Sequence, residues 1–140
     1  MKVAVLTLLA CSLFQQALVC QDIVLKGDPA TILWQGIKRE LSGPRGREYF
    51  EQVMKDTMLP ILYGTVVSST PTGHPNTLLV AMVDSDVPEV TLKLKESLKK
   101  PLPPGTPMKF QGVAETFVSE PFMLILQGCT VDRTRNRNRR

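Results

Sequence analysis

The fold of this chain is decided by residues 60–131, PILYGTVVSSTPTGHPNTLLVAMVDSDVPEVTLKLKESLKKPLPPGTPMKFQGVAETFVSEPFMLILQGCTV. Runs of β-branched and other apolar residues alternate here with turns rich in Gly, Pro, Asn and Asp, which is typical of short strands. Glycine inside the first and fourth runs suits barrel strands that bend sharply. The pattern predicts a small, closed or nearly closed β-barrel with strands at residues 61–70, 77–84, 89–95, 108–119 and 122–131.

The third predicted strand shows the clearest alternation. In EVTLKLK, we expect Val90, Leu92 and Leu94 to face the core, and the residues between them to face solvent. Together with the preceding run TLLVAMVD it predicts a β-hairpin closed by the turn Ser85–Pro88.

Two short helices are expected before the barrel, within residues 21–60. Asp28 and Pro29 form a helix start, because Asp caps free amides and Pro loses no hydrogen bond at the first helical position. This helix ends at Ser42-Gly43-Pro44, and a second, amphipathic helix is predicted from about Arg47 to Leu59. The fold class is therefore α+β, with a helical N-terminal segment followed by the barrel at residues 61–132.

Residues 1–20 have the outline of a secretory signal peptide. One lysine is followed by VAVLTLLACSLF and a polar end. This apolar run is shorter than the ~20 residues needed to span a bilayer, so no transmembrane span is expected. We expect cleavage near Cys20, hence a secreted or periplasmic protein. Lipid attachment at Cys20 and an ordinary buried helix are the alternatives.

The positive charge of the chain is concentrated at its C-terminus. The formal net charge is +4, but five arginines fall in residues 133–140. Without them and Lys2, acidic residues outnumber basic ones, which argues against nucleic-acid binding through the charge of the barrel itself. We expect a disordered, Arg-rich tail composed of residues 133–140, including Arg133, Arg135, Arg137, Arg139 and Arg140.

The three cysteines, Cys11, Cys20 and Cys129, make neither a disulfide framework nor a zinc motif. Two of them belong to the N-terminal segment. Cys129 stands among apolar neighbours on the last predicted strand, where it is expected to be a small core residue.

The order of these elements resembles the OB-fold, a five-stranded Greek-key barrel. The resemblance is carried by a glycine-bearing first strand, a hairpin, a connection, and then residues 103–126, PPGTPMKFQGVAETFVSEPFMLIL. Within it, Gly105–Gly112 (GTPMKFQG) resembles the phrase that opens the fourth strand of many such domains. The usual helix before that strand is reduced to one expected turn at Glu96–Lys100. The resemblance implies a five-stranded antiparallel OB-like barrel.

A second resemblance is to uncharacterised exported proteins of soil bacteria. It is carried by four stretches: YFEQVMKDTMLPILYGTVVSSTP, PEVTLKL, PGTPMKFQGV and PFMLIL. It implies export and a place in the bacterial envelope, but no activity.

No catalytic or metal site is evident in the sequence. A nucleophile needs a base within hydrogen-bond reach, and the single histidine, His74, stands in a turn without an accompanying nucleophile motif. Asp84, Asp86 and Glu89 cluster at the second turn, but they lack the spacing of a calcium loop, so solvated turn acids are the favoured interpretation. We expect no cofactor, and a hydrolase using His74 or the two aspartates is the last of three hypotheses.

The leading hypothesis is a non-catalytic exported binding or structural module that contacts a protein or an envelope polymer. Its contact region is expected at a barrel mouth formed by the loops 71–76, 84–88 and 101–107. The alternative is an OB-fold protein that binds single-stranded nucleic acid, although strands two and three carry no aromatic residue for stacking. In that case the basic tail supplies the charge. The candidate binding residues are His74, Asn76, Asp84, Asp86, Lys93 and Lys95.

Overall fold

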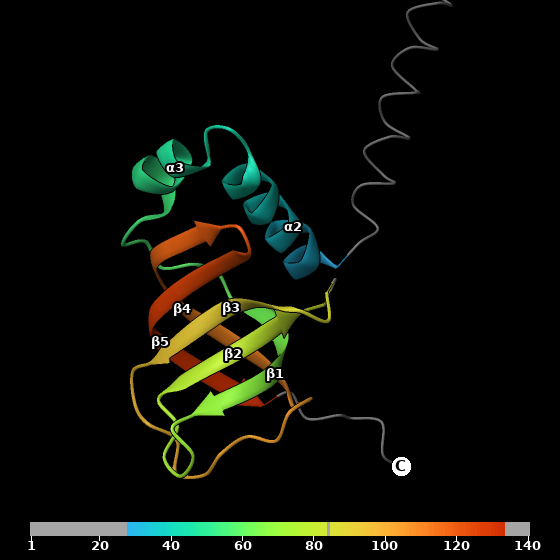
Figure 1. The fold of residues 1–140 in the computed structure, drawn as a ribbon, viewed down its shortest axis with the longest axis vertical. Coiled ribbons are helices and arrows are strands. Elements are labelled where there is room, and N and C mark those ends of the chain that lie inside the picture. The colour runs from blue at the N-terminus through green and yellow to red at the C-terminus, as the bar shows by residue number, and fades with distance from the viewer. Residues whose placement is uncertain (1–27, 84, 134–140) are drawn as a thin grey trace, which may run out of the picture.

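A computed structural model of the chain describes residues 28–83 and 85–133 (Figure 1). Its elements in chain order are α2 (Pro29–Ser42), α3 (Gly46–Tyr49), the π-helical turn η1 (Phe50–Met54), β1 (Leu62–Thr70), β2 (Thr77–Met82), β3 (Pro88–Leu94), β4 (Pro107–Ser119) and β5 (Phe122–Arg133). The predicted signal peptide, with Cys11 and Cys20, lies outside these described residues.

The five strands close into a barrel in the order β1-β2-β3-β5-β4, with β4 paired back to β1. This confirms a helical segment followed by a five-stranded barrel, which is compatible with an OB-like small barrel. One departure is that β3 and β5 are parallel, so the barrel is mixed. An odd number of strands cannot alternate in direction around a closed ring, so at least one neighbouring pair must be parallel.

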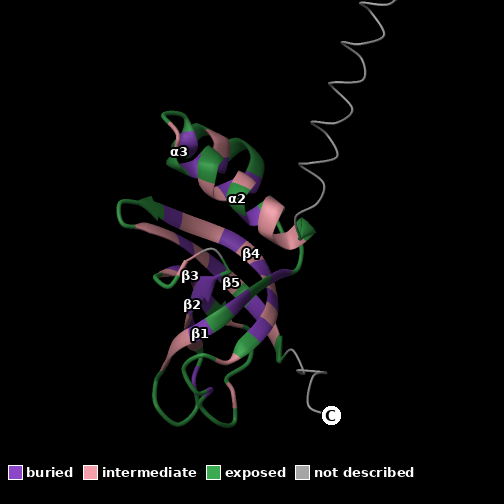
Figure 2. Cartoon of the chain, turned by 90° about the vertical axis from the view of Figure 1, so that its right-hand side faces the viewer, coloured by how far each residue is buried: buried purple, intermediate pink, exposed green. Residues whose placement is uncertain are grey.

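The barrel interior is apolar, as the alternation predicts. The best buried residues lie on β2, β3, β4 and β5 and are Leu78, Val80, Val90, Leu92, Ala114, Leu124 and Leu126. Figure 2 shows the buried positions along the strands, whereas the loops at the end away from the helices are exposed. Burial of these side chains stabilises the barrel by about 1.5–3 kcal/mol each before the entropy of ordering the chain is counted.

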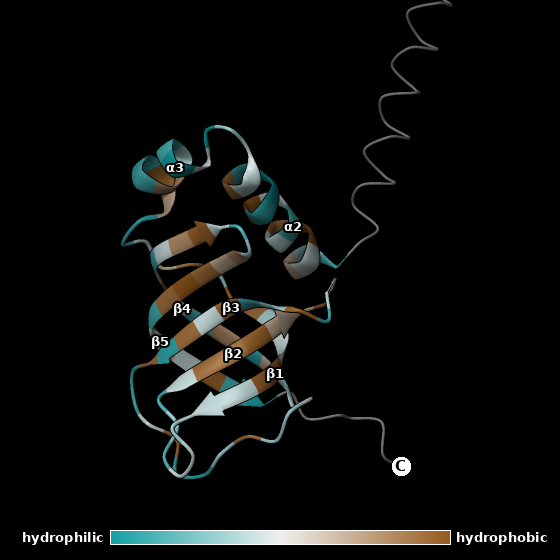
Figure 3. Ribbon diagram, in the orientation of Figure 1, coloured by the Kyte–Doolittle hydropathy of each residue, from teal (hydrophilic) through white to brown (hydrophobic). Residues whose placement is uncertain are grey.

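Helix α2 lies across one end of the barrel (Figure 1). It begins where Asp28 Oδ2 accepts hydrogen bonds from the backbone amide and the hydroxyl of Thr31, both at 3.1 Å. Trp34, Ile37 and Leu41 share its buried face, and the Trp34 ring packs edge-on against Phe122 of β5 at 5.9 Å. The hydropathy colouring shows the apolar stripe of α2 and the polar residues beside it (Figure 3). The helix therefore closes this end of the core.

The second helix is shorter than predicted. It ends at Met54 instead of Leu59, because the following backbone pairs with β4. The amides of Asp56 and Leu59 donate to the carbonyls of Ala114 and Gly112, at 2.9 and 3.0 Å. Asp56 adopts a positive φ of 58° to make this change of direction. Met58, which follows the helix end, and Val53, within η1, are about half exposed.

The barrel has two distinct ends. At the helix end lie α2, the β2–β3 turn at residues 83–87 and the β4–β5 turn at residues 120–121. At the loop end lie the β1–β2 loop at residues 71–76, the β3–β4 connection at residues 95–106 and the last residues of β5 (Figure 1). The connection is described throughout and contains no helix, so the helical turn expected at Glu96–Lys100 is absent.

Candidate functional site

The loop end is held together by backbone hydrogen bonds between segments that are distant in sequence. The amide of Leu94 donates to the carbonyl of Asn76 at 2.7 Å, and the amide of Leu98 donates to that of Pro75 at 2.8 Å. The amide of Lys95 donates to the carbonyl of Cys129 at 3.0 Å. These bonds fasten the start of the β3–β4 connection both to the β1–β2 loop and to β5. The end of the barrel is therefore an ordered surface.

Between these segments lies a pocket of about 430 Å³, which we call the loop-end pocket. Its walls are the segment 94–99 on one side and residues 129–131 of β5 on the other. A volume of this size falls within the range of small-molecule sites. The lining residues are Leu94, Lys95, Glu96, Ser97, Leu98, Lys99, Cys129, Thr130 and Val131.

A bulge in β5 shapes one wall of the pocket. Gly128 has a positive φ of 59°, and the register of β5 slips at this point against both β3 and β4. Cys129 follows the bulge and is buried against Gly112 of β4, where an added Cβ would lie 2.5 Å from its Sγ. The two glycines therefore serve different purposes, since one supplies the turn and the other makes room for the thiol.

Cys129 is unsuited to nucleophilic chemistry. Burial raises the pKa of its thiol to about 11, while a hydrogen bond from the backbone of Lys93 acts in the opposite direction. The thiolate is the reactive form of cysteine, so at neutral pH this side chain is an inert part of the wall. It is a free cysteine, in agreement with its expected place in the core.

The charged groups of the loop-end pocket are mostly cationic. Lys95, Lys99 and Glu96 belong to its lining and are exposed. Four ion pairs form among the described residues, and their cations are Lys38, Lys55, Lys93 and Lys109. Neither lysine of the pocket is therefore neutralised by an acid within the described part of the chain.

A smaller depression of about 160 Å³ lies on the other side of the end of β5. It shares Thr130 and Val131 with the loop-end pocket and is otherwise lined by residues of β4 and by Ile61 and Asp132. Its lysine, Lys109, forms an ion pair with Asp132 at 3.6 Å. Because that pairing neutralises its one cation, this depression is the less suited of the two to a charged ligand.

The structure divides the predicted binding residues between several places. Lys95 lines the loop-end pocket, while Lys93 forms an ion pair with Glu115 at 2.8 Å. His74 and Asn76 are exposed on the β1–β2 loop, and the hydroxyl of Thr77 donates to the side-chain oxygen of Asn76 at 3.1 Å. The histidine takes part in no side-chain hydrogen bond with another described residue.

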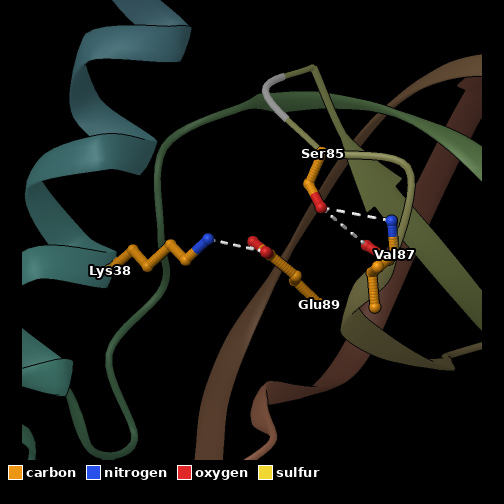
Figure 4. Close-up of polar contacts among 4 residues, drawn as sticks. All are labelled: Lys38, Ser85, Val87 and Glu89. Atoms are coloured by element: carbon orange, nitrogen blue, oxygen red, sulfur yellow. Dashed lines mark hydrogen bonds and ion pairs between the residues drawn. The ribbon is translucent and has the colours of Figure 1, made fainter.

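The three loops expected to share one barrel mouth are separated. Loops 71–76 and 101–107 lie at the loop end, but Asp86 stands in the β2–β3 turn at the helix end and is exposed. The reason is topological: in an antiparallel chain of strands, successive connections fall at opposite ends. Asp84 lies outside the described residues. The turn itself is held by Ser85, whose Oγ accepts from the amide of Val87 at 3.1 Å (Figure 4).

Glu89 departs from its expected exposure. It turns toward Lys38 of α2, and its Oε1 accepts a hydrogen bond from the lysine Nζ at 2.6 Å (Figure 4). Only 7% of the residue is exposed, because α2 covers this part of β3. The nearby depression lined by Trp34, Tyr63 and Met82 measures about 10 Å³, which is room for a single water. We interpret this region as the attachment of the helix rather than as a ligand site.

Arg133 is the last residue of β5, paired with Met108 of β4, and it is exposed. The other arginines predicted for the tail, Arg135, Arg137, Arg139 and Arg140, lie outside the described residues. The basic run of the sequence therefore begins at the loop end of the barrel.

Within residues 28–83 and 85–133, no group of three or more His, Cys, Asp and Glu side chains gathers in a way that could hold a metal ion. The described helices include none that is long and apolar enough to cross a membrane.

Sequence reasoning found one residue of the loop-end pocket, Lys95, and missed most of the others. The connection after β3 was expected to form a helical turn, which would have directed Lys99 and Leu98 differently. The available signal was the series of prolines at 101, 103 and 104, which favours extended backbone over helix.

Comparison with protein-family models, with curated proteins and with solved structures gave no match to this chain.

Proposed function

We propose that the chain is an exported, non-catalytic binding module that holds its ligand in the loop-end pocket. The observation that carries the proposal is the pocket of about 430 Å³, with walls fixed by backbone hydrogen bonds from three separate segments. A preformed wall lowers the entropic cost of binding, because little of it must be ordered by the ligand.

The chemistry of the described residues supports a binding role over a catalytic one. A covalent mechanism needs an activated nucleophile beside a base. Cys129 has a raised pKa and is buried, and the exposed His74 forms no side-chain hydrogen bond with it. The pocket instead combines four apolar side chains with five polar or charged ones, which supply apolar contacts and polar recognition groups for a ligand.

The strand order supports assigning the barrel to the OB class. The chain crosses from β3 to β4, and β5 then enters between these two strands, which is a Greek-key connection. The kinship with uncharacterised exported bacterial proteins rests on the sequence resemblance alone.

Export is supported by the composition of residues 1–20, and its test is the N-terminus of the mature protein. We expect Edman sequencing of the protein from native cells to begin near Cys20 or Gln21, in material recovered outside the cytoplasm. An intact Met1 on cytoplasmic protein would overturn this part of the proposal.

Binding is tested by amide chemical shifts of the purified, isotope-labelled chain during titration with a small-molecule fragment library. We expect the perturbed amides to concentrate at residues 94–99 and 129–131. Hits that concentrate on the outer face of β2 and β3, or a library without a hit at the loop end, would contradict the proposed site.

The second candidate function is binding of single-stranded nucleic acid. It is favoured by the position of Arg133, which places the start of the basic run beside the pocket residues Thr130 and Val131. Against it, β2 and β3 carry no aromatic side chain, and stacking is worth about 1–3 kcal/mol per base.

Oligothymidylate distinguishes the two functions. If the basic run binds nucleic acid, affinity falls steeply with salt and is lost when Arg135, Arg137, Arg139 and Arg140 are replaced by Gln. We expect instead weak binding by the wild-type chain, with no perturbation of the amides that line the pocket.

A further inference from the structure

We infer that the ligand of the loop-end pocket is a small amphipathic anion, with an apolar tail and a carboxylate or phosphate head. This inference rests on the proposed function and specifies the class of ligand for the same pocket. Two features of the pocket support it independently: an apolar floor and a cationic rim.

The floor consists of half-buried side chains that continue the barrel core. Leu94, Leu98 and Val131 line the pocket and also pack against the core cluster, to which the buried Cys129 of the same lining belongs. Leu94, Leu98 and Val131 each keep part of their surface in contact with solvent. An apolar tail in the pocket would remove that surface from water, with a gain of about 25 cal/mol for each Å² buried.

The rim carries two lysines that are free to bind an anion. Lys95 and Lys99 are exposed and are joined to no acid among the described residues, whereas Lys109, beside the neighbouring depression, is paired with Asp132. One acid, Glu96, shares the rim, so the lining retains a net positive charge. Lys100 and Arg133 are also exposed at this end of the barrel and add to the positive potential.

The charge and composition of the lining argue against two other occupants of the pocket, the C-terminal segment of the chain and a nucleic acid base. The C-terminal segment of the chain continues from Arg133 with further arginines, so its entry would bring like charges together at the lysines. Nucleic acid bases require aromatic side chains for stacking, and the lining contains none. An anion with a flexible aliphatic tail satisfies both features of the pocket.

The experiment compares four ligands with the same tail and different heads: octanoate, octyl phosphate, octyl glucoside and octyltrimethylammonium, each kept below its micelle concentration. Affinity is measured from the amide shifts of residues 94–99 and 129–131 in the purified chain. We expect octanoate or octyl phosphate to bind with a dissociation constant on the order of 1 mM. The neutral and cationic ligands should bind at least about fivefold more weakly.

The two anions also separate the sources of the ligand. Preference for octanoate indicates a fatty-acid-like carboxylate, and preference for octyl phosphate indicates a phosphorylated amphiphile; either supports the inference. Equal or tighter binding of octyltrimethylammonium would overturn it, as would octyl glucoside binding as tightly as the anions.

Variants test the two features separately. The double variant K95M/K99M keeps an unbranched side chain, one atom shorter, at both positions and should weaken anion binding about tenfold, without affecting octyl glucoside. The matched control K55M removes an exposed lysine just after η1, far along the chain from the pocket, and should leave the affinity unchanged. Unchanged anion affinity in K95M/K99M, with the fold intact by circular dichroism, would overturn the role of the rim.

Replacement of Val131 by the isosteric Thr makes the floor more polar at nearly constant volume. We expect V131T to weaken all four octyl ligands by about threefold, because every one of them places its tail there. No change in V131T would refute the apolar floor. If fragments bind at the loop end but none of the octyl anions does, the ligand class is wrong while the binding module stands.

Discussion

The ion pair between Lys38 and Glu89 provides a test of how α2 is held on the barrel. Lys38 Nζ lies 2.6 Å from Glu89 Oε1, and the side chains are 33% and 9% exposed respectively. The second oxygen, Oε2, has no hydrogen-bond partner among the described residues. The loss of one partner is therefore more costly for Glu89 than for Lys38, because only the lysine can turn to solvent.

This asymmetry fixes the order of two substitutions. In K38M, the carboxylate stays buried without its partner, and an uncompensated buried charge costs about 3–5 kcal/mol. In E89Q, the lysine is a third exposed and can be hydrated. The loss of unfolding free energy is then that of one charged hydrogen bond, at the lower end of about 1.5–3 kcal/mol. We expect K38M to lose about 3 kcal/mol of unfolding free energy and E89Q about 1.5 kcal/mol.

The assay is urea unfolding followed by tryptophan fluorescence. Trp34 is the single tryptophan of the chain and is 1% exposed on the buried face of the same helix, so its emission reports release of α2. The double variant K38M/E89M removes both charges and should recover most of the loss, to within about 1 kcal/mol of the wild type. The reasoning is refuted if E89Q is the more damaging change, or if the double variant is as unstable as K38M.

Three further predictions follow from the packing. In G112A, the new Cβ would lie 2.5 Å from the Sγ of Cys129, so we expect a loss of about 2 kcal/mol in thermal unfolding, partly restored in G112A/C129A; equal stability of both variants would contradict the contact. G46A should destabilise because its Cβ would collide with the carbonyl of Leu41, whereas G36A, with open space around it in α2, should stabilise by about 0.5–1 kcal/mol. Alkylation of folded Cys129 by iodoacetamide should be slow at neutral pH and become faster toward pH 11, and fast alkylation at neutral pH would disprove this. Because the folded protein holds the thiol proton to a higher pH than the unfolded chain, the contribution of Cys129 to stability should be complete below about pH 9 and be lost as the pH rises to about 11.

Local chemistry explains why much of the fold could be predicted. Asp28 and Pro29 start α2 because a capping side chain and a residue lacking an amide act within one helical turn. The alternation of Val90 and Leu92 with polar residues specifies which face of β3 is inward. The ends of the strands agree with the turn residues to within a residue or two. These features depend on neighbours in sequence, so a reader of the sequence has the information needed.

The tertiary structure decided the features that depend on contacts between segments distant in sequence. Closure of five strands required the parallel β3–β5 pair, and it separated Asp86 from the loops it was expected to join. Backbone pairing with β4 ended the second helix at Met54, and the arrival of α2 buried Glu89.

The candidate site belongs to this second class. The loop-end pocket exists because the segment after β3 lies against β5, which follows it by about thirty residues, and neither segment shows this contact in its own composition. The sequence alone determined the strands, the first helix and the placement of charge, since these follow from short-range periodicity and capping. The three-dimensional structure alone determined the pocket, because a cavity is a property of the surfaces that closure of the barrel brings together.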